Sequence, residues 1–221
     1  MIRLQPRLLP AGDAALLVEF ADEIDDSVND HVHALAYALR AQARPEILDL
    51  VPAYSSFLVC YDPRRVSFTE ISAVLCSTIE SLQTYTPSQP RLVEIPTHYG
   101  GEFGPDLAFV AQHNGITEAE VIRLHTSVIY RVYFVGFAPG FAYLGSVPEQ
   151  IAAPRMETPR TRVPAGSVGI AGRQTGIYPM ETPGGWRIIG HTTLPLFDPD
   201  CDSPALLRPG DRVQFIPMNN G

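Results

Sequence analysis

The chain contains no lysine. All 16 of its basic residues are arginines. A P-loop needs a lysine to reach the phosphates, and a Schiff-base enzyme needs a lysine amine. The absence excludes both kinds of site, together with biotin attached to a lysine of this chain. A genome that favours arginine codons also explains the pattern, but the exclusions hold in either case.

Cysteine clusters and long apolar runs are missing as well. Three scattered cysteines (Cys60, Cys76, Cys201) argue against a disulfide framework, and no HExxH or CxxC motif is present, so we predict no metal site. No run approaches the roughly 20 apolar residues of a membrane helix. The N-terminal sequence MIRLQPRLLPAGD lacks the apolar core of a secretory signal. We therefore expect a cytoplasmic protein, and its net charge of -8 argues against nucleic acid as a partner.

The first part of the chain alternates between strand and helix patterns. The expected elements are a strand, a helix, two strands, a helix and a strand: Ala14–Phe20, Asp25–Ala43, Ile47–Tyr61 for both middle strands, Ser67–Leu82, and a strand from Arg91. Ser67 and Glu70 have capping-box spacing. This β-α-β-β-α-β order predicts a small ferredoxin-like α/β domain over residues 1–88, with Tyr85–Pro90 as the seam.

Glycine is concentrated in the second part, where ten of the 17 glycines lie between Gly136 and Gly190. Two short helices are expected, one after Pro105 and one from Thr117. Beyond them, short apolar strands such as SVGIAG and WRIIG are separated by turn residues, which favours a compact barrel. The fold class is therefore α+β, with a β-barrel domain over residues 89–221.

The same segment is rich in arginine. Between Gly136 and Gly190 there are five arginines and three acids, although the whole chain is acidic. A positive region of this kind can hold an anionic ligand through guanidinium hydrogen bonds. The alternative is that these arginines cap carbonyl groups and pair with the nearby glutamates.

Several runs in this region resemble a known family. They are YRVYFVGFAPGFAYLG (Tyr130–Gly145), APR (Ala153–Arg155) and TPRTRVPAGSVGIAGRQTGIYPMETPGGWRIIG (Thr158–Gly190), with GDAALLVEF, VPAYSSFLVCYDP, YGGEFGPDL, EVIRLH and PGDRVQF elsewhere. Together they resemble the 5-oxoprolinase B-subunit family, also called the kinase-A-inhibitor or allophanate hydrolase subunit 1 family. His98 departs from the family pattern, where cysteine is common, and so do His191 and Thr193, where arginine and proline are expected.

The resemblance implies a cyclophilin-like barrel for the second domain. It also implies two partners, a C-subunit with a related barrel and a separate A-subunit, which together with this chain cleave 5-oxo-L-proline to L-glutamate at the expense of ATP. Some relatives are described as inhibitors of a sensor histidine kinase. The same domain occurs in urea carboxylase and allophanate hydrolase systems as a carboxyltransferase unit. We expect the 5-oxoprolinase function and keep the kinase-inhibitor and carboxyltransferase functions as alternatives.

Candidate site residues come from the glycine-rich region and the helix before it. Opening a lactam requires an activated amide carbonyl, a held anion and exclusion of water. We predict the catalytic residues Arg160, Arg162 and His125, and the substrate-binding residues Arg155, Gly166, Ser167, Gln174, Thr175, Tyr178 and Trp186. ATP has no recognised motif here, so its site is expected to be shared with the partner or to lie in it.

Each of these residues also has a structural interpretation. His125 can cap a helix end, and Gly166 can serve a β-turn instead of an oxyanion cradle. Trp186 can pack in a core or an interface. Phe137, Phe141 and Tyr143 can form a pocket rim, a docking loop or ordinary core.

Overall fold

The computed structural model describes residues 6–82 and 90–218. The chain divides into two compact units, Met1–Gln89 and Pro90–Gly221. The seam expected at Tyr85–Pro90 lies outside the described residues, apart from Pro90. Each unit has its own hydrophobic core.

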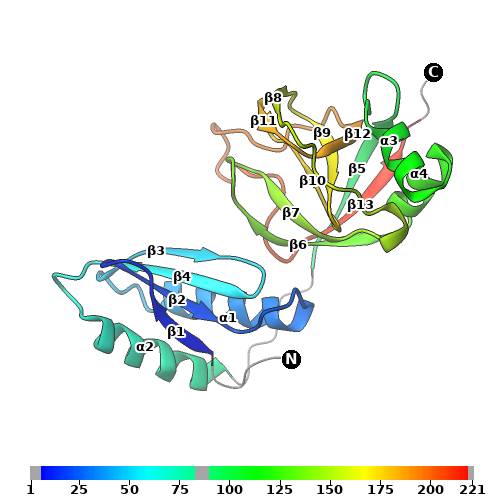
Figure 1. The fold of residues 1–221 in the computed structure, drawn as a ribbon. Coiled ribbons are helices and arrows are strands. Elements are labelled where there is room, and N and C mark those ends of the chain that lie inside the picture. The colour runs from blue at the N-terminus through cyan, green and yellow to red at the C-terminus, as the bar shows by residue number, and fades with distance from the viewer. Residues whose placement is uncertain (1–5, 83–89, 219–221) are drawn as a thin grey trace. The chain divides into compact units, whose positions relative to one another are not determined.

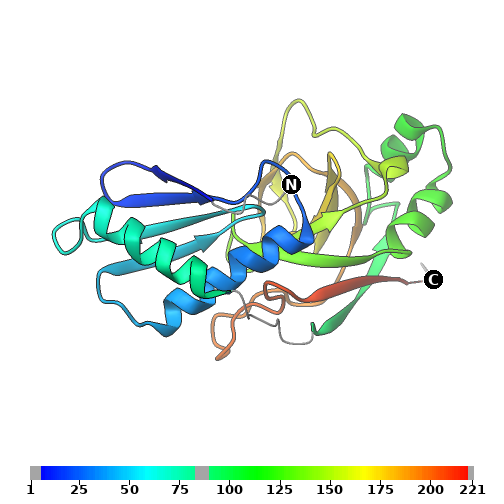
Figure 2. The same ribbon diagram turned by 90° about the horizontal axis from the view of Figure 1, so that it is seen from below.

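The first unit is a four-stranded antiparallel sheet with two helices on one face (Figure 1, Figure 2). The sheet order is β1-β2-β4-β3. The elements are β1 (Arg7–Pro10), β2 (Ala15–Glu19), α1 (Asp26–Ala41), β3 (Ile47–Pro52), β4 (Ser56–Tyr61) and α2 (Phe68–Ser81). Alternate strand residues such as Leu16, Val18 and Phe57 point into the core, where they meet the apolar faces of both helices.

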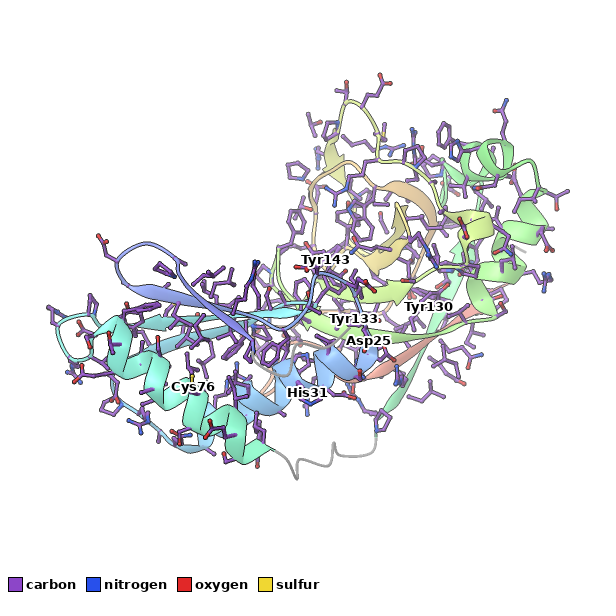
Figure 3. The ribbon with its side chains drawn as sticks, turned by 60° about the horizontal axis from the view of Figure 1, so that its bottom comes forward. Asp25, His31, Cys76, Tyr130, Tyr133 and Tyr143 are labelled. Carbon is purple, nitrogen blue, oxygen red and sulfur yellow. The ribbon has the colours of Figure 1, made fainter. Side chains whose placement is uncertain are left out.

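Side chains cap both helices of this unit. Asp25, at the start of α1 in Figure 3, accepts hydrogen bonds from the backbone N–H groups of Ser27 and Val28. Ser67 and Glu70 form the reciprocal capping box that their spacing predicts. These contacts satisfy N–H groups that have no partner within the helix, so local sequence sets where each helix begins.

The predicted ferredoxin-like order is not confirmed for the first unit. The expected last strand exists as β5 (Leu92–Tyr99), but it belongs to the second unit and pairs with β13 (Arg212–Pro217). Within the first sheet, β1 pairs with β2 instead, so the order is β-β-α-β-β-α. An alternating apolar pattern shows that a segment is a strand but does not identify its partner, which explains this error.

The second unit contains a closed barrel of seven strands, as expected from the short apolar segments. The order around the barrel is β10-β7-β6-β13-β5-β12-β9 (Figure 1). Besides β5 and β13, the strands are β6 (Ile129–Val135), β7 (Ala142–Ser146), β9 (Ser167–Ala171), β10 (Gln174–Ile177) and β12 (Arg187–His191). The finer likeness to a cyclophilin barrel stays a prediction.

Two helices and a small sheet surround the barrel. Helix α3 (Leu107–Asn114) packs against β12, and α4 (Glu118–Thr126) packs against β13. The two-stranded sheet joins β8 (Arg160–Val163) to β11 (Thr182–Gly184). A separate buried cluster lies beside the main core, with members from several loops and strands: Phe141, Val163, Ala171, Tyr178, Trp186 and Ile188. This aromatic cluster forms the base of the candidate site.

None of the helices in the described ranges has the length and apolarity that a membrane span requires.

Candidate functional site

An aromatic cavity opens beside the small sheet of the second unit. Its volume is about 240 Å³. The lining residues come from the β6–β7 turn, β7, the segment before β8, and the chain around β11: Phe137, Phe141, Tyr143, Arg155, Pro159, Tyr178, Pro183, Gly184, Gly185 and Trp186. Five of these are aromatic and two are prolines, so the cavity presents rings and apolar edges to a ligand.

The aromatic walls meet edge to face. The Phe141 ring is perpendicular to Trp186, with ring centroids 5.6 Å apart, and it meets Tyr178 at 77° and 5.4 Å. Tyr143, which projects from β7 in Figure 3, lies 5.0 Å from Phe141 at 66°. Such pairs place the positive edge of one ring against the negative face of another, which holds the walls in fixed orientations.

Glycines behind the walls let the rings approach the barrel. Gly169 on β9 pairs with Gly176 on β10. A Cβ at Gly176 would lie 3.1 Å from the Phe141 ring and 3.2 Å from the indole of Trp186, and a Cβ at Gly169 would lie 3.1 Å from the Trp186 Cβ. The two strands therefore act as a flat support for the aromatic walls because they carry no side chain at this point.

Arg155 supplies positive charge at the cavity. It is exposed, and its guanidinium carbon lies 6.0 Å from the ring centroid of Trp186. Among the described residues that line the cavity, it is the one with a charged side chain. An apolar, ring-lined space with a cation at one side suits a small ligand that has a flat apolar body and an anionic group.

Two phenols add polar groups to the same space. Burial raises the pKa of Tyr178 above its ordinary value, while a hydrogen bond from the Trp186 backbone and the charge of Arg155 act against it. Burial likewise raises the pKa of Tyr143. Both phenols are thus protonated at neutral pH and can donate hydrogen bonds to a ligand oxygen.

Arg160 and Arg162 do not line this cavity. Arg160 donates two hydrogen bonds of 2.9 Å to the buried carboxylate of Asp106. Arg162 makes a similar fork with Glu181 at the surface, where its side chain is 75% exposed. Both guanidinium groups therefore contact carboxylates of the chain itself. Arg162 pairs with a nearby glutamate, as the alternative interpretation predicts, whereas the partner of Arg160 is the distant Asp106. A direct catalytic role for either residue stays a prediction.

His125 lies in the barrel core and is fully buried. Its Nε2 is 2.9 Å from the hydroxyl of Thr175, and its Nδ1 is 2.8 Å from the hydroxyl of Tyr99. The Thr175 hydroxyl donates its proton to the Gly169 carbonyl, so it accepts a hydrogen bond from the Nε2–H of His125. The other ring nitrogen, Nδ1, is then unprotonated and accepts a hydrogen bond from the Tyr99 hydroxyl. Burial lowers the pKa of His125 to about 3. This neutral imidazole has no exposure to a ligand, so the general-base role predicted for it has no structural counterpart here.

The predicted oxyanion cradle is also occupied by internal bonds. The N–H of Gly166 donates to the Tyr178 carbonyl at 2.7 Å, and the N–H of Ser167 donates to Pro164. The positive φ of Gly166 and the nearby His191 imidazole fit the turn interpretation. Gln174 begins β10 and does not line the cavity, and the same is true of buried Thr175. Of the predicted substrate-binding residues, the structure brings together Arg155, Tyr178 and Trp186.

Comparison with known proteins relates this chain to a family. The family described as "Carboxyltransferase domain, subdomain C and D" matches residues 6–207. The chain is 45% identical over 216 residues to the B-subunit of 5-oxoprolinase from Bacillus subtilis (strain 168), covering 93% of this chain and 90% of that protein. It is also 45% identical over 211 residues to the B-subunit of 5-oxoprolinase from Escherichia coli O157:H7, covering 95% of both.

The chain belongs to the 5-oxoprolinase B-subunit family. The resemblance carried by the glycine- and arginine-rich runs is thereby confirmed. Among solved structures, the protein TTHA0988 superposes with a TM-score of 0.81 at 39% identity. That match covers 94% of this chain and 40% of TTHA0988, so this chain spans less than half of that protein.

Sequence reasoning misses several contributors to the site, among them Pro183 and Asp106. Pro183 lines the cavity, and Asp106 holds Arg160 from a helix start more than 50 residues earlier. No local pattern marks either role, because both depend on how distant loops meet. The aromatic residues of the segment Phe137–Tyr143 are the sequence feature that indicates the cavity, although the same residues are also compatible with core packing.

The described residues contain no group of three or more His, Cys, Asp or Glu side chains that could hold a metal ion.

Proposed function

We propose that this chain is the B-subunit of an ATP-dependent 5-oxoprolinase, which cleaves 5-oxo-L-proline to L-glutamate together with an A-subunit and a C-subunit. The supporting observation is 45% identity over nearly the whole length to two proteins named as B-subunits of 5-oxoprolinase. As a member of such a complex, the chain is active only with its partners. We also keep a cytoplasmic location as part of this proposal.

The aromatic cavity is the proposed substrate site. 5-Oxoproline is a five-membered lactam with one carboxylate, and a cavity of about 240 Å³ lies just below the range of roughly 300–1,000 Å³ typical of larger ligands. The ring packs against Trp186 and Phe141, and the carboxylate pairs with Arg155. The phenols of Tyr143 and Tyr178 donate toward the lactam carbonyl, which would favour charge developing on that oxygen.

ATP does not fit the residues that line this cavity well. A triphosphate is held by a lysine, by several arginines or by a glycine-rich loop ahead of a helix, with a bound magnesium ion. Here Arg155 is the single charged side chain among the described residues that line the cavity, and Arg160 and Arg162 already contact carboxylates. We therefore assign ATP, as the co-substrate that activates the lactam carbonyl, to the partner subunits. This chain binds and orients the lactam and excludes water from it.

Reconstitution tests the proposal. The three purified subunits are mixed with 5-oxo-L-proline and ATP, and glutamate is measured with and without this chain. We expect glutamate only in the complete mixture. Glutamate at an equal rate without this chain would refute the proposed function. A parallel assay with purified histidine kinase tests the regulatory alternative, for which an unchanged rate of autophosphorylation is expected.

A carboxyltransferase role is the second candidate, because the matching family is described as a carboxyltransferase domain. With no lysine, this chain cannot carry biotin, but the cavity would receive a carboxylated biotin from another protein. Free carboxybiotin offered to the complex tests this role through transfer of labelled carbon dioxide to an acceptor amide such as urea. No transfer, together with glutamate formation, favours the 5-oxoprolinase.

A further inference from the structure

The segment Ala153–Arg160, named here the strap, carries Arg155 to the edge of the cavity. Several contacts tie the strap to the barrel. Ala153 bridges to Gly172, and the carbonyl of Pro154 accepts a hydrogen bond of 3.2 Å from Arg187. The N–H of Met156 donates to the Gly185 carbonyl at 2.8 Å. That last bond joins the residue after Arg155 to the residue before Trp186, so it forms a first clamp between the two segments that carry the cation and the ring.

Asp106 forms a second clamp between the same two segments. Its carboxylate accepts both N–H groups of the Arg160 fork, and it also accepts the backbone N–H of Ile188 at 2.7 Å. The N–H of Asp106 in turn donates to the carbonyl of Ile188 at 2.8 Å. Arg160 ends the strap, and Ile188 lies two residues beyond Trp186. One carboxylate therefore fixes both chain segments that carry Arg155 and Trp186.

Burial makes this second clamp rigid. The Asp106 side chain is 9% exposed and that of Arg160 is 27% exposed. A bidentate guanidinium–carboxylate pair fixes direction as well as distance, and a buried carboxylate without its partner is strongly unfavourable. Asp106 precedes α3, so the clamp also ties the strap to the start of that helix.

We propose that Asp106 and Arg160 are positioning residues, which set the separation of Arg155 from Trp186 and through it the affinity of the cavity for a small carboxylate. The proposal rests on the proposed function, since 5-oxoproline is the carboxylate in question. Arg160 acts on the substrate through Arg155, without contact of its own. This role differs from the catalytic one that the sequence suggests for Arg160.

The test uses the reconstituted three-subunit enzyme with Arg160→Gln, Arg160→Lys and Asp106→Asn. We expect Arg160→Gln to raise the KM for 5-oxoproline about tenfold and to change kcat less than threefold. Arg160→Lys, which keeps the charge but loses the fork, should raise KM less. The control is Arg123→Gln, which breaks an exposed Arg–Glu pair on α4 and should leave KM unchanged.

A second readout does not depend on turnover. Trp186 is the single tryptophan of the chain, so its fluorescence reports on the cavity alone. We expect a red-shifted emission and at least twofold stronger quenching by iodide in Arg160→Gln and Asp106→Asn, measured well below each variant's melting temperature. Arg123→Gln should match the wild type.

The outcomes separate the two proposals. A fall in kcat with an unchanged KM in Arg160→Gln would place Arg160 in the chemistry and overturn the positioning role. Unchanged emission and quenching in that variant would overturn it as well. If the wild-type mixture forms no glutamate, the proposed function fails, and the Trp186 fluorescence still decides whether the clamp orders the cavity. A variant that does not fold is replaced by Arg160→Lys, in which the same fluorescence shift is expected at smaller size.

Discussion

The guanidinium carbon of Arg155 lies 6.0 Å from the ring centroid of Trp186, and both residues line the same cavity. A cation at this distance is attracted by the negative face of the indole. Because Arg155 is exposed, an anion can reach its guanidinium N–H groups and accept hydrogen bonds from them. Arg155 thus provides the charge that binds an anion, and the fluorescence of Trp186 reports that binding.

Replacing Arg155 should weaken substrate binding more than any other change at the cavity. Arg155→Ala removes a charge-assisted hydrogen-bonding group, a loss of about 1.5–3 kcal/mol. We expect the KM for 5-oxoproline to rise roughly 10- to 100-fold in the three-subunit assay. Arg155→Lys should recover part of the loss because it keeps the charge. A KM within twofold of the wild-type value in Arg155→Ala would remove this residue from the substrate site.

Ligand binding should be visible in the isolated chain. Addition of 5-oxo-L-proline is expected to change Trp186 emission with a saturating dependence on concentration. 2-Pyrrolidone has the same lactam ring without the carboxylate, so it should bind at least tenfold more weakly if Arg155 holds that group. Equal responses to both compounds would show that the ring alone is recognised.

The buried His125 should make the fold sensitive to acid. In the unfolded chain this histidine takes up a proton near its ordinary pKa of 6.5, whereas in the folded chain burial delays protonation to a pKa of about 3. The unfolded state therefore binds more protons between these values, and the free energy of unfolding falls as the pH drops from 6.5 to 3. Between pH 7 and pH 5 the loss from His125 amounts to about 2 kcal/mol.

Urea unfolding at pH 7 and pH 5 measures this loss. His125→Gln should be less stable than the wild type at pH 7, since it disturbs the bonds to Tyr99 and Thr175. It should nevertheless lose about 2 kcal/mol less than the wild type between the two pH values. An identical pH dependence in both proteins would mean that His125 titrates normally in the folded state.

Two neighbouring glycines provide a matched test of the cavity wall. A Cβ at Gly184 would lie 2.9 Å from ring carbons of buried Tyr178, whereas a Cβ at Gly185 would meet Pro159 at an ordinary 3.6 Å. Gly184→Ala should therefore lower the free energy of unfolding by about 1–3 kcal/mol and displace the Tyr178 ring, while Gly185→Ala should change it by less than about 1 kcal/mol. Chemical unfolding of both variants checks the difference, and equal effects would contradict the crowding at Tyr178.

The sequence predicts most elements of this chain but not all of their partners. The residues around a helix start are sufficient to predict it: Ser67 and Glu70 cap α2 as their spacing indicates. The strand at Leu92–Tyr99 is also expected, yet it pairs with β13 about 120 residues later. Pairing over that distance is decided by the whole barrel, and no short pattern contains it.

The candidate site shows the same limit. Residue type predicts Arg155, Tyr178 and Trp186, and they do meet at one cavity. Arg160 and Arg162 have the same residue type and the same neighbourhood in sequence, but each contacts a carboxylate. The carboxylate that holds Arg160 comes from Asp106, so tertiary structure alone distinguishes an arginine that is available to a ligand from one that is not.

The parallel pairing of β5 with β13 has a consequence for how the protein is made. Leu92 aligns with Arg212, so the first and last strands of the second unit are neighbours in the barrel wall. Contacts between such distant residues form late and slowly, because a long loop must be ordered first. On the ribosome, the barrel can therefore close only after β13 has left the exit tunnel, long after its neighbour β5 has been synthesised.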